Sequence, residues 1–176
     1  MNSRIDYKSV APEALKAMYA LENYVRECGL EHRLLELVKV RASQMNGCAY
    51  CIDMHTKDAR VLGESEQRLY AISVWRETPF FSDRERAALS WTEAVTAVGE
   101  SHVPDEIYDM ARRQFGEREL VELTMAVIAI NGWNRLGVSF RAVPATYSPA
   151  EPAAASQRLE SATRTSVSRG GKTDAA

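Results

Sequence analysis

The sequence predicts an all-α fold, a helical bundle that assembles into an oligomer. Several long segments carry apolar residues three and four positions apart, which is the period of one helix face. No segment shows convincing strand alternation of apolar and polar residues. The apolar faces exceed what one small bundle can cover, so we expect copies of the chain to associate.

The first half of the chain is expected to contain four helices. Pro12 fits a first helical turn, and Gly29 and Gly63 are typical of residues that follow a helix end. The second segment is apolar on nearly all sides, which predicts a buried helix. The expected bounds are 11–28, 31–45, about 48–62 and 66–75.

The second half is expected to contain four more. Ser82 and Glu85 have the spacing of a capping box and open a helix to about residue 98. Pro104 starts the next, and the continuously apolar segment after it predicts a central helix. Asn131 and Gly132 are expected to interrupt that helix. The remaining expected bounds are about 104–116, 118–130 and 133–142.

Length and composition predict one domain with a tail. The chain has 176 residues, of which 45% are hydrophobic, enough for a core without disulfides. We place the helical domain at 1–146. Residues 147–176 are rich in Ala, Ser and Arg and nearly lack large apolar side chains, which predicts a disordered tail.

Charge and cysteine content restrict the partners and the compartment. A formal net charge of −2 gives no reason to expect nucleic acid or a membrane as a partner. The first twenty residues carry too many charges for a signal peptide. Three cysteines without such a signal predict a reducing, cytoplasmic setting, where a close pair is typical of catalysis or metal binding.

The most informative motif is Cys48-x-x-Cys51-x-x-x-His55. On a helix, residues three, four and seven apart lie on one face. The helix N-terminus favours a thiolate at Cys48, whereas His55, one turn away, favours a thiolate at Cys51. We favour Cys51 as the attacking thiolate and Cys48 as the resolving thiol.

Such a pair can reduce a hydroperoxide. The thiolate becomes a sulfenic acid, the second thiol condenses with it to a disulfide, and an external dithiol reduces that disulfide. The same pair suits a dithiol–disulfide oxidoreductase or a non-enzymatic redox-sensing oligomer. A metal site would lack an obvious fourth ligand, so we expect neither metal nor cofactor. Two buried structural cysteines with a core histidine remain the simplest alternative.

Glu36 is an acidic residue in a predicted buried helix. Burial of a carboxylate is costly unless it is paired or protonated. It either packs against His55 or a bridging water and accepts the thiol proton, or it pairs with Lys39 or Arg41 or lies at the rim. Periodicity does not separate these choices.

Residues 36–55 strongly resemble the core of AhpD-like alkylhydroperoxidases, which belong to the carboxymuconolactone decarboxylase superfamily. The shared pattern is Glu36, twelve residues before Cys48, followed by Cys51 and His55. Residues 131–135 resemble a second block of that family. The likeness covers roughly residues 15–141.

The resemblance implies an all-α fold, assembly into trimers or hexamers, and peroxidase activity. It implies that Cys51 is peroxidatic, that Cys48 is resolving, and that His55 and Glu36 relay protons. The implied partners are a hydroperoxide and an external dithiol, which in this family can be a lipoyl-bearing protein. A mycobacterial member has a histidine immediately before the second cysteine, where this chain has Tyr50.

Overall fold

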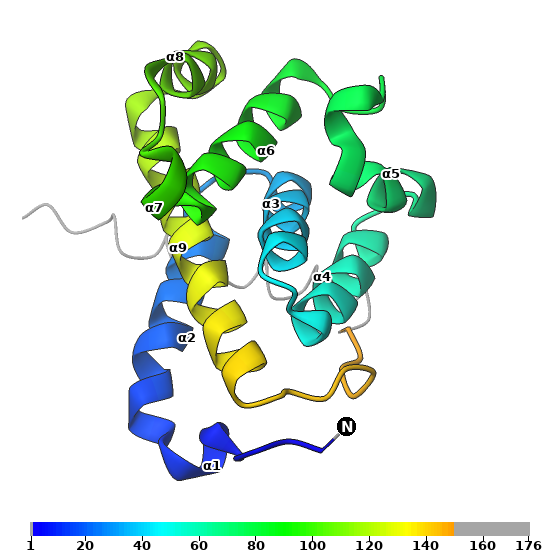
Figure 1. The fold of residues 1–176 in the computed structure, drawn as a ribbon, viewed down its shortest axis with the longest axis vertical. Coiled ribbons are helices and arrows are strands. Elements are labelled where there is room, and N and C mark those ends of the chain that lie inside the picture. Colours follow the sequence, from blue (N-terminus) through cyan, green and yellow to red (C-terminus); the bar gives the residue numbers. More distant parts are fainter. Residues whose placement is uncertain (1, 150–176) are drawn as a thin grey trace, which may run out of the picture.

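Helix α3 lies at the centre of the fold, with α4, α6, α9 and the 3-10 helix η1 packed around it (Figure 1). The computed structural model describes residues 2–149, which form helices and no strand. The all-α prediction is confirmed. The elements are α1 (Tyr7–Val10), α2 (Pro12–Glu27), α3 (His32–Met45), α4 (Ala49–Val61), α5 (Glu66–Ala71), η1 (Ile72–Glu77), α6 (Asp83–Thr96), α7 (Val98–Ser101), α8 (Asp105–Gln114) and α9 (Glu117–Ser139).

The two sides of α3 face two different parts of the core. Leu34 and Val38 pack into a cluster with apolar residues of α2, α6, α8 and α9. Leu37 and Val40 pack into a second cluster with residues of α4, α5 and η1, including Trp75. A helix that is apolar on most sides is stable only when neighbours cover it all round. This explains why α3 lies at the centre, and the prediction that it is a buried helix is confirmed.

The start of α6 follows the predicted capping box. The Glu85 backbone N–H donates to Ser82 Oγ at 3.3 Å, and the Ser82 backbone N–H donates to Glu85 Oε2 at 2.8 Å. Each side chain thereby satisfies a backbone donor that the first turn leaves without a helical partner.

The predicted break at Asn131 and Gly132 is wrong, because α9 continues through both residues to Ser139. The Asn131 amide Nδ2 donates to Val127 O at 2.9 Å and to Thr96 Oγ1 at 3.0 Å. These bonds hold Asn131 inside the helix rather than in a turn. A Cβ on Gly132 would lie 2.8 Å from Met18 Cε, so glycine allows α2 to pack closely against α9.

Other segments also differ from the expected bounds, and the short helices α1 and α7 were not predicted. The helix expected over 66–75 ends at Ala71 and continues as the 3-10 helix η1, in which Val74 has non-helical torsion angles. Tyr147, the first residue of the expected tail, contacts α4, and residues 150–176 lie outside the described part of the chain. Among residues 2–149, no helix is both long enough and apolar enough to cross a membrane.

Candidate active site

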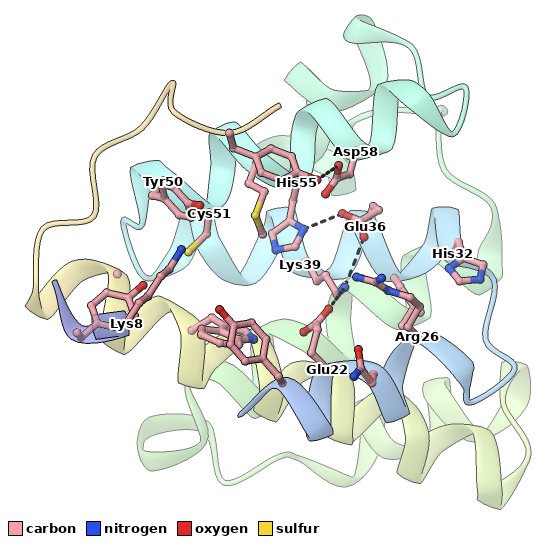
Figure 2. Close-up of a pocket in the computed structure, with 18 residues that line it drawn as sticks. Lys8, Glu22, Arg26, His32, Glu36, Lys39, Tyr50, Cys51, His55 and Asp58 are labelled. Carbon is pink, nitrogen blue, oxygen red and sulfur yellow. Dashed lines mark hydrogen bonds and ion pairs between the residues drawn. The ribbon is translucent and has the colours of Figure 1, made fainter. Parts of the chain in front are cut away.

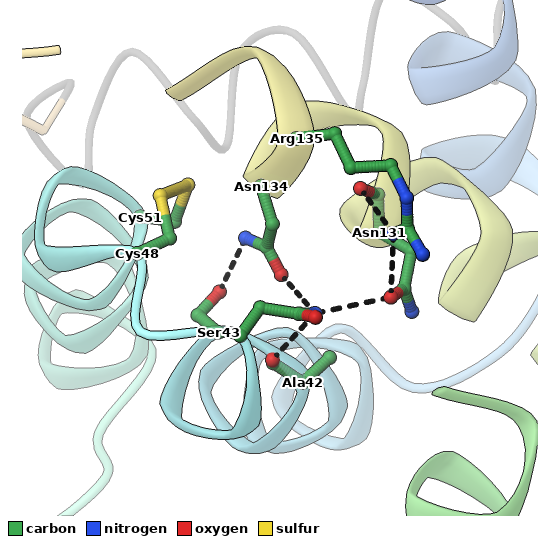
Figure 3. The surroundings of a disulfide bond; sticks show 8 residues. Ala42, Ser43, Cys48, Cys51, Asn131, Asn134 and Arg135 are labelled. Carbon is green, nitrogen blue, oxygen red and sulfur yellow. Dashed lines mark hydrogen bonds between the residues drawn. A yellow bond between two sulfur atoms is a disulfide. The ribbon is translucent and has the colours of Figure 1, made fainter. Parts of the chain in front are cut away.

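Cys48 and Cys51 form a disulfide at the start of α4 (Figure 3). Their Cα atoms are 5.4 Å apart. Cys48 precedes the helix as its N-terminal cap, with φ −85° and ψ 93°, whereas Cys51 lies in the first turn. Gly47 reverses the chain before it with φ +66°, a conformation that favours glycine. The predicted shared helix face therefore holds for Cys51 and His55, while Cys48 lies just outside the helix.

Three asparagines tie the turn before Cys48 to α9 (Figure 3). Asn46 Nδ2 lies 2.9 Å from Ala42 O, 3.0 Å from Asn131 Oδ1 and 2.9 Å from Asn134 Oδ1. Asn134 Nδ2 donates to Ser43 Oγ at 3.0 Å. Sequence reasoning missed this network. The signal present in the sequence is a pair of amide side chains, Asn131 and Asn134, directly after the mostly apolar segment 120–130.

Helix α9 also packs directly on the disulfide. A Cβ on Gly137 would lie 2.9 Å from Cys48 Sγ and 3.6 Å from Cys51 Sγ. Cys48 is 1% exposed and Cys51 is 3% exposed. Glycine at this position therefore allows α9 to cover the sulfur atoms.

A cavity of about 260 Å³ opens beside Cys51 and not beside Cys48 (Figure 2). Five tyrosine and tryptophan side chains line it together with Cys51 and His55. They are Tyr7, Tyr19, Tyr50 and Trp133 from α1, α2, α4 and α9, and Tyr147 from the segment after α9. The cavity thus gives a small molecule access to one of the two sulfur atoms.

His55 and Glu36 form a buried pair across α4 and α3. His55 Nδ1 lies 2.8 Å from Glu36 Oε2, and the residues are 4% and 8% exposed. Burial by itself raises the pKa of Glu36, but the attraction of His55 and Lys39 outweighs it and the net pKa is lowered. Glu36 is therefore a carboxylate that orients the imidazole.

Lys39 completes the charge balance around Glu36. Its Nζ lies 2.6 Å from Glu22 Oε1 and 3.5 Å from Glu36 Oε1. Burial lowers the pKa of Lys39, while Glu36 and Glu22 raise it, and the net pKa is raised. Of the partners left open for Glu36, His55 contacts one carboxylate oxygen and Lys39 the other. Arg41 pairs with Glu93 instead, so the Arg41 alternative is wrong.

Glu36, His55 and Asp58 are the side chains best placed to hold a metal ion among the described residues. Their ligand atoms lie within 4.8 Å of one another. Each carboxylate already has a partner, however, because Lys39 pairs with Glu36 and the Tyr147 hydroxyl donates to Asp58 Oδ1 at 2.7 Å. Burial raises the pKa of Asp58. These residues fit a hydrogen-bonded proton network better than a metal centre.

Comparison with known proteins assigns the family. Residues 12–94 match the carboxymuconolactone decarboxylase family. The uncharacterised protein YdfG of Bacillus subtilis is 43% identical over 139 residues, which is 79% of this chain and 95% of YdfG. The chain belongs to the carboxymuconolactone decarboxylase family.

Solved structures place the chain among the AhpD-like members of the carboxymuconolactone decarboxylase family. A protein of unknown function from Agrobacterium tumefaciens, suggested to be the antioxidant defence protein AhpD, is 48% identical. It has a TM-score of 0.81 and covers 83% of this chain and 100% of its own. A peroxidase-related protein from Silicibacter is 22% identical with a TM-score of 0.68, covering 76% and 71% of the two chains. The latter likeness shows the fold alone.

The fold also occurs in enzymes with other chemistry. The debrominase Bmp8 is 19% identical with a TM-score of 0.71, covering 78% of this chain and 74% of its own. Membership of the family, together with the likeness to the Agrobacterium protein, supports an enzyme with a peroxidase-related role. Because an enzyme of the same fold is a debrominase, the fold by itself does not define the reaction.

Proposed function

We propose that this protein is a thiol-dependent peroxidase that reduces hydroperoxides through a Cys48–Cys51 disulfide cycle. One observation carries the proposal. Cys51, which is bonded to Cys48, lines the cavity beside His55, and Glu36 holds that imidazole from the neighbouring helix. The site thus combines a nucleophile, a base that is oriented by a carboxylate, and a second thiol within bonding distance.

The first step is attack on the peroxide. In the reduced protein, the Nε2 atom of His55 accepts the Cys51 thiol proton, because Nδ1 bonds to Glu36. The thiolate forms an S–O bond with the terminal peroxide oxygen as the O–O bond breaks. The departing alkoxide takes the proton from His55 and leaves as an alcohol, and Cys51 becomes a sulfenic acid.

The second step closes the disulfide. The Cys48 sulfur attacks the Cys51 sulfur, the S–O bond breaks, and the leaving hydroxide takes the Cys48 proton to form water. The two Cα atoms are 5.4 Å apart, within the range that a disulfide requires, so the helix start needs no rearrangement.

An external dithiol then restores the two thiols by exchange and is itself oxidised to a disulfide. The burial of both sulfur atoms favours a slender dithiol, such as a lipoyl group, over a flat protein surface. We also propose that the chain acts as a homo-oligomer, because Val121 and Ile128 are exposed apolar residues seven positions apart on one face of α9.

Stopped-flow kinetics test the proposal. The reduced protein is mixed with hydrogen peroxide, with an alkyl hydroperoxide and with a small disulfide, and the consumption of thiols is followed. We expect both peroxides to react much faster than they do with a free thiol, and Cys51→Ser to abolish the reaction. Slow peroxides with a fast disulfide would instead establish a dithiol–disulfide oxidoreductase. A redox-dependent change in assembly without turnover would establish a sensor.

A further inference from the structure

The cavity beside Cys51 is much larger than hydrogen peroxide requires. Its volume is about 260 Å³, whereas one water molecule takes up about 30 Å³ in the liquid. A small peroxide would leave most of the space filled by solvent. The cavity is closer in size to the pockets that proteins use for small organic ligands.

Aromatic rings form the part of the cavity next to Cys51. Tyr19 and Trp133 pack against each other with ring centroids 5.2 Å apart. Tyr50 directly precedes Cys51, and Tyr7 approaches from α1. Burial and the neighbouring phenol of Tyr50 raise the pKa of Tyr7, so its hydroxyl stays protonated. Such a wall favours an apolar or aromatic body that lies against the rings.

One cation at this end of the cavity has no acidic partner. The Lys8 ammonium lies 5.9 Å from the centroid of the Tyr50 ring and forms no ion pair within residues 2–149. Asp6, the nearest acidic residue in the sequence, bonds the Lys8 backbone N–H instead. Figure 2 shows the Lys8 side chain reaching toward Cys51 and Tyr50.

The other cations of the cavity lie among carboxylates. Lys39 pairs with Glu22 and Glu36. Arg26 is drawn beside this group, at the opposite end of the cavity from Lys8 (Figure 2). An incoming anion would therefore meet Glu22 and Glu36 near Arg26, whereas the Asp6 carboxylate near Lys8 is bonded to the Lys8 backbone N–H.

We propose that the cavity binds organic substrates that join an apolar or aromatic body to an anionic group, with Lys8 holding the anion. This inference rests on the proposed function for the reaction at Cys51 and names the substrate class of that site. The rings of Tyr50 and Trp133 contact the body, and the anion at Lys8 keeps the molecule beside Cys51. Lys8 is thus a specificity-determining residue and takes no part in the proton transfers.

Equilibrium binding tests this preference without any turnover. Isothermal titration calorimetry of the oxidised protein compares 3-phenylpropionate with 3-phenyl-1-propanol, which differ mainly in charge. We expect the acid to bind about fivefold more tightly than the alcohol, as for a partly exposed ion pair, and less so at high salt. Lys8→Met and Lys8→Gln should bring the acid-to-alcohol affinity ratio close to one, and Lys8→Arg should restore it.

The matched control is Lys16→Met, which removes an exposed lysine of α2 that does not line the cavity. It should leave the affinity ratio as in the wild type. Equal binding of acid and alcohol, no measurable binding of either, or loss of the preference in Arg26→Met but not in Lys8→Met would overturn the proposal.

Steady-state kinetics with two substrates separate this inference from the proposed function. Cumene hydroperoxide and its para-carboxylate are compared as substrates, and the carboxylate should have a kcat/KM about fivefold higher, a difference that Lys8→Met removes. Turnover of both at equal rates would overturn the substrate class and leave the peroxidase standing. A binding preference without any turnover would overturn the peroxidase and leave the anion site standing.

Discussion

His55 Nδ1 lies 2.8 Å from Glu36 Oε2, and both side chains are almost completely buried between α3 and α4. The carboxylate fixes the ring orientation and holds the proton on Nδ1. The opposite ring nitrogen is left to exchange protons with Cys51. The proposed peroxidase reaction therefore depends on Glu36 as the residue that orients this imidazole.

Replacement of Glu36 by glutamine tests this positioning role. Glu36→Gln keeps the shape but removes the charge that orients and stabilises the imidazolium, so kcat/KM for hydroperoxide should fall about 10–100-fold. The pH profile of kcat/KM should shift as well, which loss of structure alone would not produce. Glu13→Gln, an exposed carboxylate of α2, is the matched control and should leave both unchanged.

The two cysteines should behave differently when each is replaced by serine. Cys48→Ser retains the cavity-facing sulfur, so it should consume one equivalent of peroxide and accumulate a sulfenic acid that dimedone labels at Cys51. Cys51→Ser should consume none. Mass spectrometry of labelled peptides distinguishes them, with Cys28→Ser as control for the remaining thiol, which is half-buried and unbonded to sulfur. Labelling at Cys48 in Cys51→Ser would reverse the assigned roles.

The carboxyl groups of Glu36 and Asp58 should make stability depend on pH with opposite signs. The lowered pKa of Glu36 stabilises the fold above its ordinary value of 4.5, and this contribution is lost as pH falls through the lower folded value. The raised pKa of Asp58 acts oppositely, because stability falls as pH rises from 3.8 toward the folded value. Urea denaturation measures the free energy of unfolding at each pH. For Glu36→Gln this free energy should rise less steeply with pH than for the wild type, and for Asp58→Asn it should rise more steeply.

Two glycines of α9 should respond differently to alanine. Both changes improve helix propensity by about 1 kcal/mol. In Gly137→Ala the new Cβ meets Cys48 Sγ at 2.9 Å, and the disulfide cannot move aside, so a net loss of about 1–3 kcal/mol is expected. In Gly132→Ala the Cβ meets the flexible end of Met18, so the change should cost less. Urea denaturation of both variants measures the difference, and equal effects would contradict the tight contact.

The hydrogen bond between Asn134 and Ser43 should contribute a measurable coupling to the free energy of unfolding. Asn134→Ala leaves Ser43 Oγ and the Asn46 amide without their buried partner and should cost about 1–3 kcal/mol. Ser43→Ala and the double variant complete a thermodynamic cycle, in which a coupling of about 0.5–1.5 kcal/mol is expected. Strictly additive effects would show that the hydrogen bond contributes nothing to stability.

The sequence predicted those parts of the fold that depend on neighbouring residues. The capping box of Ser82 and Glu85 formed as expected, because both residues lie within one turn. The register of Cys51 and His55 also followed from sequence, since a spacing of four places both on one face of any helix. The break at Asn131 was wrong because buried partners outweighed a local turn preference.

The sequence by itself determined the long helices of the first half, the start of α6, the cysteine pair and the histidine that accompanies it. Only the tertiary structure decided that Glu36 reaches His55, that Gly137 covers Cys48, and that Lys8 faces the same cavity as Cys51. These contacts join residues that are 19 to 89 positions apart. Side-chain periodicity fixes which residues share a helix face, whereas the packing of one helix on another fixes which faces meet.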